Sequence, residues 1–164
     1  MKKYQPWFGL FARLVVGGII FAAGFLKVDE LEKSQMAVRA YEILPIGIAN
    51  FFGTILPFAE VAIGLLLILG AATRINALLS AALMALFIVA IAQAGLRGLT
   101  IDCGCFGGGG QVAKGETRYL QEIVRDTGIM ALALYLYRYP SSKFSLDKED
   151  TQQPQEELQE ETKG

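Results

Sequence analysis

Four apolar stretches, each about as long as a membrane-spanning helix, constrain this chain more than any other feature of its sequence. They run from about Phe8 to Val28, from about Ile46 to Gly70, from about Ile75 to Leu96 and from about Tyr119 to Tyr139. A spanning helix needs roughly 20 predominantly apolar residues, because it must cross a hydrocarbon core about 30 Å thick. The sequence therefore predicts an all-α fold, an integral membrane bundle of four helices.

The composition agrees with a place in the lipid bilayer. Hydrophobic residues make up 53% of the 164 residues, and the mean hydropathy is +0.41. A water-soluble domain of this composition would expose large apolar patches, whereas lipid solvates the outer faces of a helix bundle. The net charge is −1, so no basic excess favours nucleic acid as a partner. The chain has no histidine, which excludes histidine-based catalysis and histidine metal ligands.

The segments outside the apolar stretches differ from one another in character. The link from Asp29 to Pro45 places its apolar residues near one helical face, which predicts a short amphipathic helix at the membrane interface. The link from Ala71 to Arg74 is short, so the helices on either side should be antiparallel neighbours. After Pro140 the chain is polar and acidic, which is typical of disorder. We expect a four-helix transmembrane domain over residues 1–140 and a disordered acidic tail over residues 141–164.

Orientation in the membrane is only weakly encoded, because four crossings leave similar numbers of basic residues on the two sides. Lys2 and Lys3 precede the first stretch, which also resembles a secretory signal, but its length and Arg13 within it favour a retained helix. The two lysines favour cytoplasmic termini in a multi-pass protein of the cell (inner) membrane. The loop between the third and fourth stretches would then be exocytoplasmic. Aromatic residues at the start of the first stretch and the end of the fourth should mark one membrane face: Tyr4, Trp7, Phe8, Tyr135, Tyr137 and Tyr139.

Small residues predict where the helices approach one another. Gly18 and Ala22 stand one turn apart in the first stretch, and Ala77, Ala81 and Ala85 are spaced in the same way in the third. Such spacing favours close packing of helix backbones in lipid.

The only two cysteines of the chain, Cys103 and Cys105, lie in a glycine-rich loop between the third and fourth stretches. The glycine between them relaxes the backbone enough for the two sulfurs to approach bonding distance. A bridge in so small a ring closes almost no loop and contributes little stability. It should be strained, and strained exposed bridges are the ones that exchange readily. The pair therefore favours a catalytic redox role over a structural one.

Two other interpretations of the cysteines remain open. They can be inert thiols, because reactivity requires a thiolate and not merely a thiol. They can also join Asp102 in a metal site, although this set is one donor short of a closed zinc site.

Ionisable residues within the apolar stretches are the second group of interest. Glu60 lies in the second stretch, Arg13 in the first, and Arg125 and Asp126 in the fourth. Such groups are costly in hydrocarbon, so they usually face the interior of a bundle and pair with each other. By depth we expect Glu60 near Arg13, and Asp126 near Lys27. Glu60, Arg125 and Asp126 would form a polar pocket, either a site for a quinone headgroup or proton path, or a buried ion-pair network that fixes helix register.

The chain resembles the DoxX-like membrane proteins, and more closely their MauE branch. The resemblance extends from about Arg13 to Tyr137 and rests on RLVVGGIIFAAGFLKV, YEILP, LPFAEVAIGLLLILG, IDCGCFG and VRDTGIMALALY. It implies a four-helix membrane protein that assists disulfide formation or electron delivery with a thioredoxin-like partner. Carried over, it implies that Cys103 and Cys105 form the redox pair. It gives Glu60 and the Arg125–Asp126 step as polar positions within the spans.

The leading hypothesis is a membrane thiol–disulfide redox protein, in which the two cysteines exchange with a thioredoxin-like protein and electrons pass to or from a quinone. The alternative is a non-enzymatic membrane anchor or assembly subunit for a redox enzyme, with incidental cysteines. A small-molecule transporter is a weaker possibility, because the chain shows no internal repeat.

Overall fold

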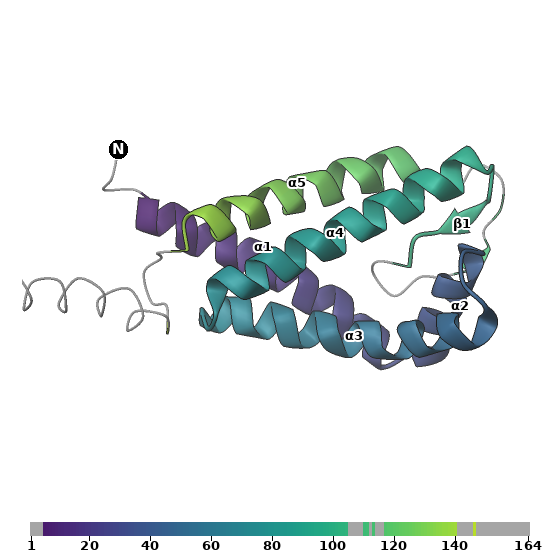
Figure 1. The fold of residues 1–164 in the computed structure, drawn as a ribbon, viewed down its shortest axis with the longest axis horizontal. Helices are drawn as coiled ribbons and strands as arrows, with labels where there is room; N and C mark the ends of the chain where they lie inside the picture. The colour runs from purple at the N-terminus through teal and green to yellow at the C-terminus, as the bar shows by residue number, and fades with distance from the viewer. Residues whose placement is uncertain (1–4, 105–109, 112, 114–116, 141–145, 147–164) are drawn as a thin grey trace, which may run out of the picture.

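The computed structural model describes residues 5–104, 110–111, 113, 117–140 and 146 (Figure 1). Its helices are α1 (Gln5–Val28), α2 (Leu31–Ala40), α3 (Ile46–Leu69), α4 (Thr73–Leu96) and α5 (Tyr119–Arg138). Two short strands, β1 (Ile101–Asp102) and β2 (Gly110–Gln111), pair antiparallel between α4 and α5. The fold is therefore helical, as predicted. The short strand pair was not predicted from the apolar pattern.

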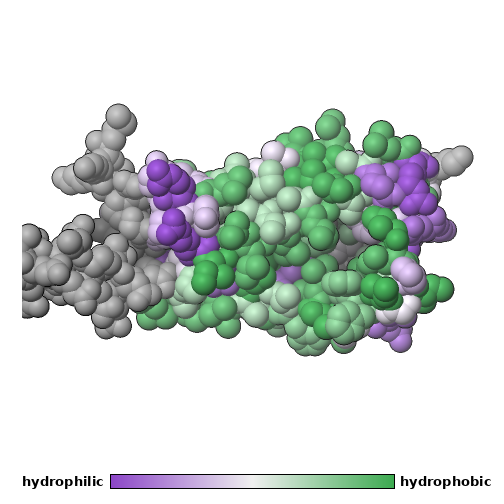
Figure 2. Space-filling view, in the orientation of Figure 1, coloured by the Kyte–Doolittle hydropathy of each residue, from purple (hydrophilic) through white to green (hydrophobic). Residues whose placement is uncertain are grey.

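Within the described residues, three helices are long and apolar enough to cross a membrane: Trp7–Val28 in α1, Ile46–Leu69 in α3 and Thr73–Leu96 in α4. Less than half of each of these segments is buried within the protein. Figure 2 shows hydrophobic side chains over the middle of the molecule and hydrophilic groups gathered towards its two ends. An apolar belt between polar ends is the surface expected of a protein that lies in a bilayer.

The fourth apolar stretch forms a helix, α5, but this helix is not among the three candidate spans. It carries Glu122, Arg125 and Asp126 within its first half, which lowers its mean hydropathy. Phe8 of α1 contacts Tyr135 of α5 with ring centroids 4.9 Å apart. The beginning of α1 and the end of α5 therefore lie together, as the aromatic pattern predicts.

The closest helix contact is between α1 and α3, which run antiparallel (Figure 1). A Cβ atom on Gly64 would lie 2.5 Å from the backbone nitrogen of Phe21, and one on Gly24 would lie 2.7 Å from the carbonyl oxygen of Pro57. Only glycine permits backbones to approach so closely. Gly18, which the spacing rule singles out, has no neighbour within 4 Å of an added Cβ. The prediction for Gly18 is wrong, because its neighbour Gly17 occupies the contact face.

The other principal contact is between α4 and α5. Ala77 and Ala81 of α4 are buried there, as their spacing predicts, together with Ala133 and Leu136 of α5. The turn between α3 and α4 uses left-handed residues, Gly70 with φ 70° and Ala72 with φ 46°. The two helices that it joins do touch, but each packs mainly against another helix.

The short helix α2 packs on the first half of α3. Ser34 and Ala37 are buried in this contact, and Gln35 donates a hydrogen bond to the Thr54 hydroxyl at 2.9 Å. The predicted short helix is thus confirmed as a helix, and it is folded onto the protein through its buried face. The predicted disordered tail, residues 141–164, lies outside the described residues except for Leu146.

Replacement of Gly64 by alanine should destabilise the protein by about 1–3 kcal/mol, the usual cost of overpacking. The added methyl group would meet backbone atoms of α1, which cannot move without displacing the helix. The measurement is the free energy of unfolding in mixed detergent micelles.

Gly18→Ala is the matched control, since its methyl group would meet no neighbouring atom within 4 Å. Equal unfolding free energies for the two variants would contradict this close contact between α1 and α3.

Candidate functional site

Cys103 lies immediately after β1 and is buried, with 6% of its surface exposed. It belongs to a small apolar cluster with Tyr41, Ile91, Ala94 and Ile101. The Tyr41 hydroxyl donates a hydrogen bond to the Cys103 carbonyl oxygen at 3.1 Å. Packing in this cluster and the hydrogen bond to its backbone hold Cys103 in place.

The tyrosine that holds Cys103 is itself held from a neighbouring helix. Arg97, just beyond α4, donates a hydrogen bond to the Tyr41 carbonyl oxygen at 3.1 Å and pairs with Glu42 at 3.2 Å. On the other side, the Tyr119 hydroxyl accepts a hydrogen bond from the Ile101 backbone at 3.2 Å. The strand that ends at Cys103 is therefore fixed from both the α2 side and the α5 side.

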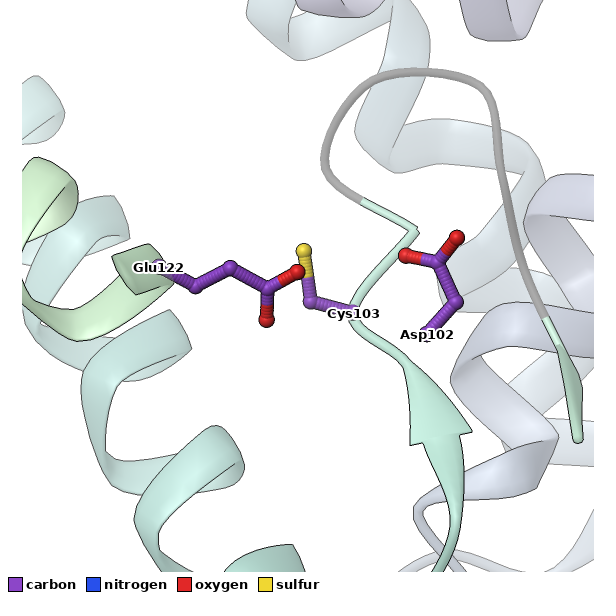
Figure 3. A group of neighbouring side chains, drawn as sticks. All are labelled: Asp102, Cys103 and Glu122. Atoms are coloured by element: carbon purple, nitrogen blue, oxygen red, sulfur yellow. The ribbon is translucent and has the colours of Figure 1, made fainter. Parts of the chain in front are cut away.

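Two carboxylates flank the Cys103 thiol (Figure 3). Glu122, from the first turn of α5, shares a side-chain hydrogen bond with it. Asp102 precedes it in the chain, and Asp102 Oδ1 accepts a hydrogen bond from the Gly104 backbone at 3.2 Å. The sulfur and one oxygen of each carboxylate all lie within 4.8 Å of one another. The thiol is thus in an acidic environment.

Glu122 is half-buried and lies outside the three candidate spans. Burial raises the pKa of its carboxyl above the ordinary value, and the hydrogen bond from Cys103 partly opposes this. The negative charges of Asp102 and Asp126 also raise this pKa, while Arg125 lowers it. A carboxyl shifted in this direction exchanges protons closer to neutral pH than an exposed glutamate does.

Cys105, the predicted partner of Cys103, lies outside the described residues. Three donors within the described residues could approach a metal ion: Asp102, Cys103 and Glu122. One thiolate and two carboxylates are one donor short of a closed zinc site. We do not assign a metal to them.

The charged residues within the helices form a second group, deeper in the protein. Lys27 Nζ of α1 lies 2.8 Å from Glu60 Oε1 of α3, and both side chains are almost fully buried. Lys27 also lies over the Phe87 ring, 5.4 Å from its centroid. The predicted pairing of Glu60 with Arg13 is wrong. Gly17 lies opposite Gly64 and Gly24 opposite Glu60, so Arg13 is about three helical turns away from Glu60 along the interface.

Asp126 and Arg125 complete this second group. Arg125 Nε donates a hydrogen bond to Asp126 Oδ1 at 2.9 Å, while the buried Asp126 Oδ2 has no hydrogen-bond partner within the described residues. A cavity of about 20 Å³ lies beside them. Its lining comes from α1, α3, α4 and α5: Ile19, Ile20, Ala23, Glu60, Met84, Phe87, Arg125, Asp126 and Ile129.

The structure brings Glu60, Arg125 and Asp126 together at one cavity, whose other lining residues are apolar. Their role as a cofactor-binding pocket stays a prediction. A cavity of about 20 Å³ has room for a water molecule, which would satisfy Asp126 Oδ2, and not for a quinone ring. Quinone binding stays a prediction.

Sequence reasoning missed three residues of these sites: Glu122, Tyr41 and Lys27 as the partner of Glu60. Glu122 could have been found, since it stands one turn before Asp126 and would share its helix face. The contact between Tyr41 and Cys103 joins residues 62 positions apart and has no local signal.

The apolar helices and their buried charges are those of a helical membrane protein. Cys103 lies where the end of α2 meets the beginning of α5. The chain belongs to the family of the methylamine utilisation protein MauE, whose family model matches residues 5–138.

Several curated relatives bear the name methylamine utilization protein MauE. The chain is 31% identical to the one from Paracoccus denitrificans, over 79% of this chain and 68% of the relative. It is 34% identical to the one from Methylophilus methylotrophus, over 62% of this chain and 54% of the relative. It is 34% identical to the one from Methylorubrum extorquens, over 64% of this chain and 57% of the relative. The chain thus spans little more than half the length of two of them. No solved structure matches it.

Because Lys27 and Glu60 form a buried pair, replacing one of them should lower the free energy of unfolding more than replacing both. Lys27→Met alone should lower the free energy of unfolding by about 3–5 kcal/mol, because it leaves a buried carboxylate without its partner. The double variant Lys27→Met with Glu60→Leu should be more stable than this single variant. Unfolding in mixed micelles measures both.

Lys33→Met is the control, because Lys33 pairs with Glu30 on the surface at 2.7 Å, where a pair is worth about 0–1 kcal/mol. A double variant less stable than Lys27→Met would show that the two charges do not stabilise each other.

Proposed function

We propose that this protein is a membrane thiol–disulfide exchange protein, in which Cys103 and Cys105 cycle between a dithiol and a disulfide. The observation that carries the proposal is the position of the Glu122 carboxylate beside the Cys103 thiol, with the sulfur and a carboxylate oxygen within 4.8 Å of each other (Figure 3). An inert thiol needs no such partner, whereas an exchanging thiol must release and regain a proton in each cycle. Gly104, with φ 67°, supplies the left-handed backbone between the two cysteines that favours a small ring.

The burial of Cys103 assigns different roles to the two sulfurs. A protein partner cannot easily reach a side chain that is only 6% exposed. We therefore expect the partner to attack Cys105, and Cys103 to leave and later resolve the mixed disulfide. A thioredoxin-like protein is the expected partner.

In the proposed topology, α5 crosses the membrane as the fourth helix of a four-helix bundle. The contact between Phe8 and Tyr135 supports an even number of crossings, since it places the two ends of the helical region together. In this topology the termini are cytoplasmic, the cysteine loop is exocytoplasmic, and the membrane is the inner one. The name of the curated relatives supports a role in methylamine utilisation. We also propose that the protein is related to the DoxX-like membrane proteins.

Thiol trapping in native membranes tests the exchange directly. Oxidant should convert the two thiols to a bridge, and a dithiol reductant should reverse this, as read from the mass added by a maleimide. Cys103 and Cys105 that never change oxidation state would contradict the proposal.

The assignment of roles has its own test with single-cysteine variants. Cys103→Ser, which retains Cys105, should form a mixed disulfide with a thioredoxin that lacks its resolving cysteine. Cys105→Ser should form at least about tenfold less, because its remaining thiol is buried. Full methylamine-dependent growth of a host with both cysteines replaced would favour the alternative, a non-enzymatic anchor.

A further inference from the structure

Glu122 stands between the thiol site and the interior of the protein. Its helix begins at Tyr119, so Glu122 occupies the first turn and projects towards β1 (Figure 3). There its carboxylate meets the Cys103 thiol. Asp126, one turn further along α5, lines the interior cavity. Glu122 therefore lies between Cys103 and the other charged residues in the first half of α5, Arg125 and Asp126.

A negative charge on the Cys103 sulfur would be unfavourable in this setting. With both neighbours ionised, a thiolate would make three negative charges within 4.8 Å. Like charges at this separation repel strongly in a partly buried site, where water screens them less. Arg125, the nearest cation on α5, is engaged with Asp126. The sulfur therefore needs a proton as soon as its bond to another sulfur opens.

We propose, on the basis of the exchange function above, that Glu122 is the proton donor and acceptor of the Cys103 thiol. A partner thiolate attacks the Cys105 sulfur and forms a new disulfide, and the bond between Cys105 and Cys103 breaks. The electron pair of that bond leaves on Cys103, and the neutral Glu122 carboxyl gives its proton to this sulfur. In the reverse direction the Glu122 carboxylate takes the proton back as Cys103 attacks the mixed disulfide.

The other groups around the thiol are less suited to this role. Asp102 Oδ1 is held by the Gly104 backbone. The Tyr41 hydroxyl donates its proton to the Cys103 carbonyl oxygen. Arg97 contacts the Tyr41 carbonyl and Glu42. Arg125 and Asp126 bind each other. The Glu122 carboxylate, by contrast, faces the Cys103 sulfur and interacts with the thiol (Figure 3).

The test uses the full chain in micelles with Cys105→Ser, which leaves one thiol, and with a chelator present. The rate of alkylation of Cys103 by iodoacetamide is followed from pH 5 to pH 10. With Glu122 the profile should show two titrations, because the carboxyl and the thiol share a site. With Glu122→Gln it should show one titration, shifted to lower pH, and alkylation near pH 7.5 should be about tenfold faster, since a negative charge beside the thiol is removed.

Two further variants separate a proton-transfer role from a structural one. Glu122→Asp keeps a carboxylate and should keep two titrations, so this variant tests the proposal if Glu122→Gln does not fold. Glu30→Gln removes an exposed carboxylate and should leave the profile unchanged. A single titration in the chain that retains Glu122, or a profile that Glu122→Gln does not alter, would overturn the proposal.

The alkylation profile does not require that a disulfide ever forms. A chain that fails thiol trapping but shows the two titrations would lose the exchange function and keep the Cys103–Glu122 proton couple. In the chain with both cysteines, reduction of the bridge by dithiothreitol should be at least about tenfold slower with Glu122→Gln, at a pH where Glu122 is neutral. An unchanged rate there would overturn the role of Glu122 in exchange.

Discussion

The buried contact between α1 and α3 is the constraint on which the thiol site depends. Glycines bring the two backbones together in one register, and Lys27 then reaches Glu60 at 2.8 Å. A shift of one turn would leave both charges buried without a partner, which a protein interior does not tolerate. Since α1 ends one residue after Lys27, this register also decides where the chain turns into α2.

The thiol site is built where two pairs of helices meet. From the α1–α3 pair, α2 folds back on α3 and delivers Tyr41 to the Cys103 carbonyl. From the α4–α5 pair, α4 leads into β1, and α5 returns with Glu122 to the Cys103 sulfur. Neither pair alone holds both the backbone and the side chain of Cys103. Movement between the pairs would therefore change the surroundings of the thiol before it changed the interior of either pair.

The apolar runs predicted four long helices with bounds within a few residues, because apolar residues and their spacing are local properties. The sequence also predicted that Glu60, Arg125 and Asp126 lie near one another, because charges in apolar helices turn inward, and these three residues line one cavity. The partner of Glu60 was predicted wrongly, since depth was judged from position in each run and not from the register of α1 on α3. The position of Glu122 one turn before Asp126 was a usable signal for a second inward carboxylate. The contacts of Glu122 and Tyr41 with Cys103 had no such signal, because they depend on the way the helices pack.

The charged residues of α5 serve the protein interior and the surroundings of Cys103, but they make the helix less suited to lipid. Glu122, Arg125 and Asp126 keep α5 out of the class of long apolar spans. The same residues supply the thiol with a carboxylate and the interior with an ion pair beside a cavity. A more apolar α5 would be more stable in lipid, but Cys103 would then lose the neighbour with which it can share a proton. The cost of these charges is reduced because Asp126 is buried against other helices and Glu122 lies in the first turn, where the helix meets the loop. The polar half of α5 is thus less favourable in lipid than an apolar helix would be, and in return it places a carboxylate beside the Cys103 thiol.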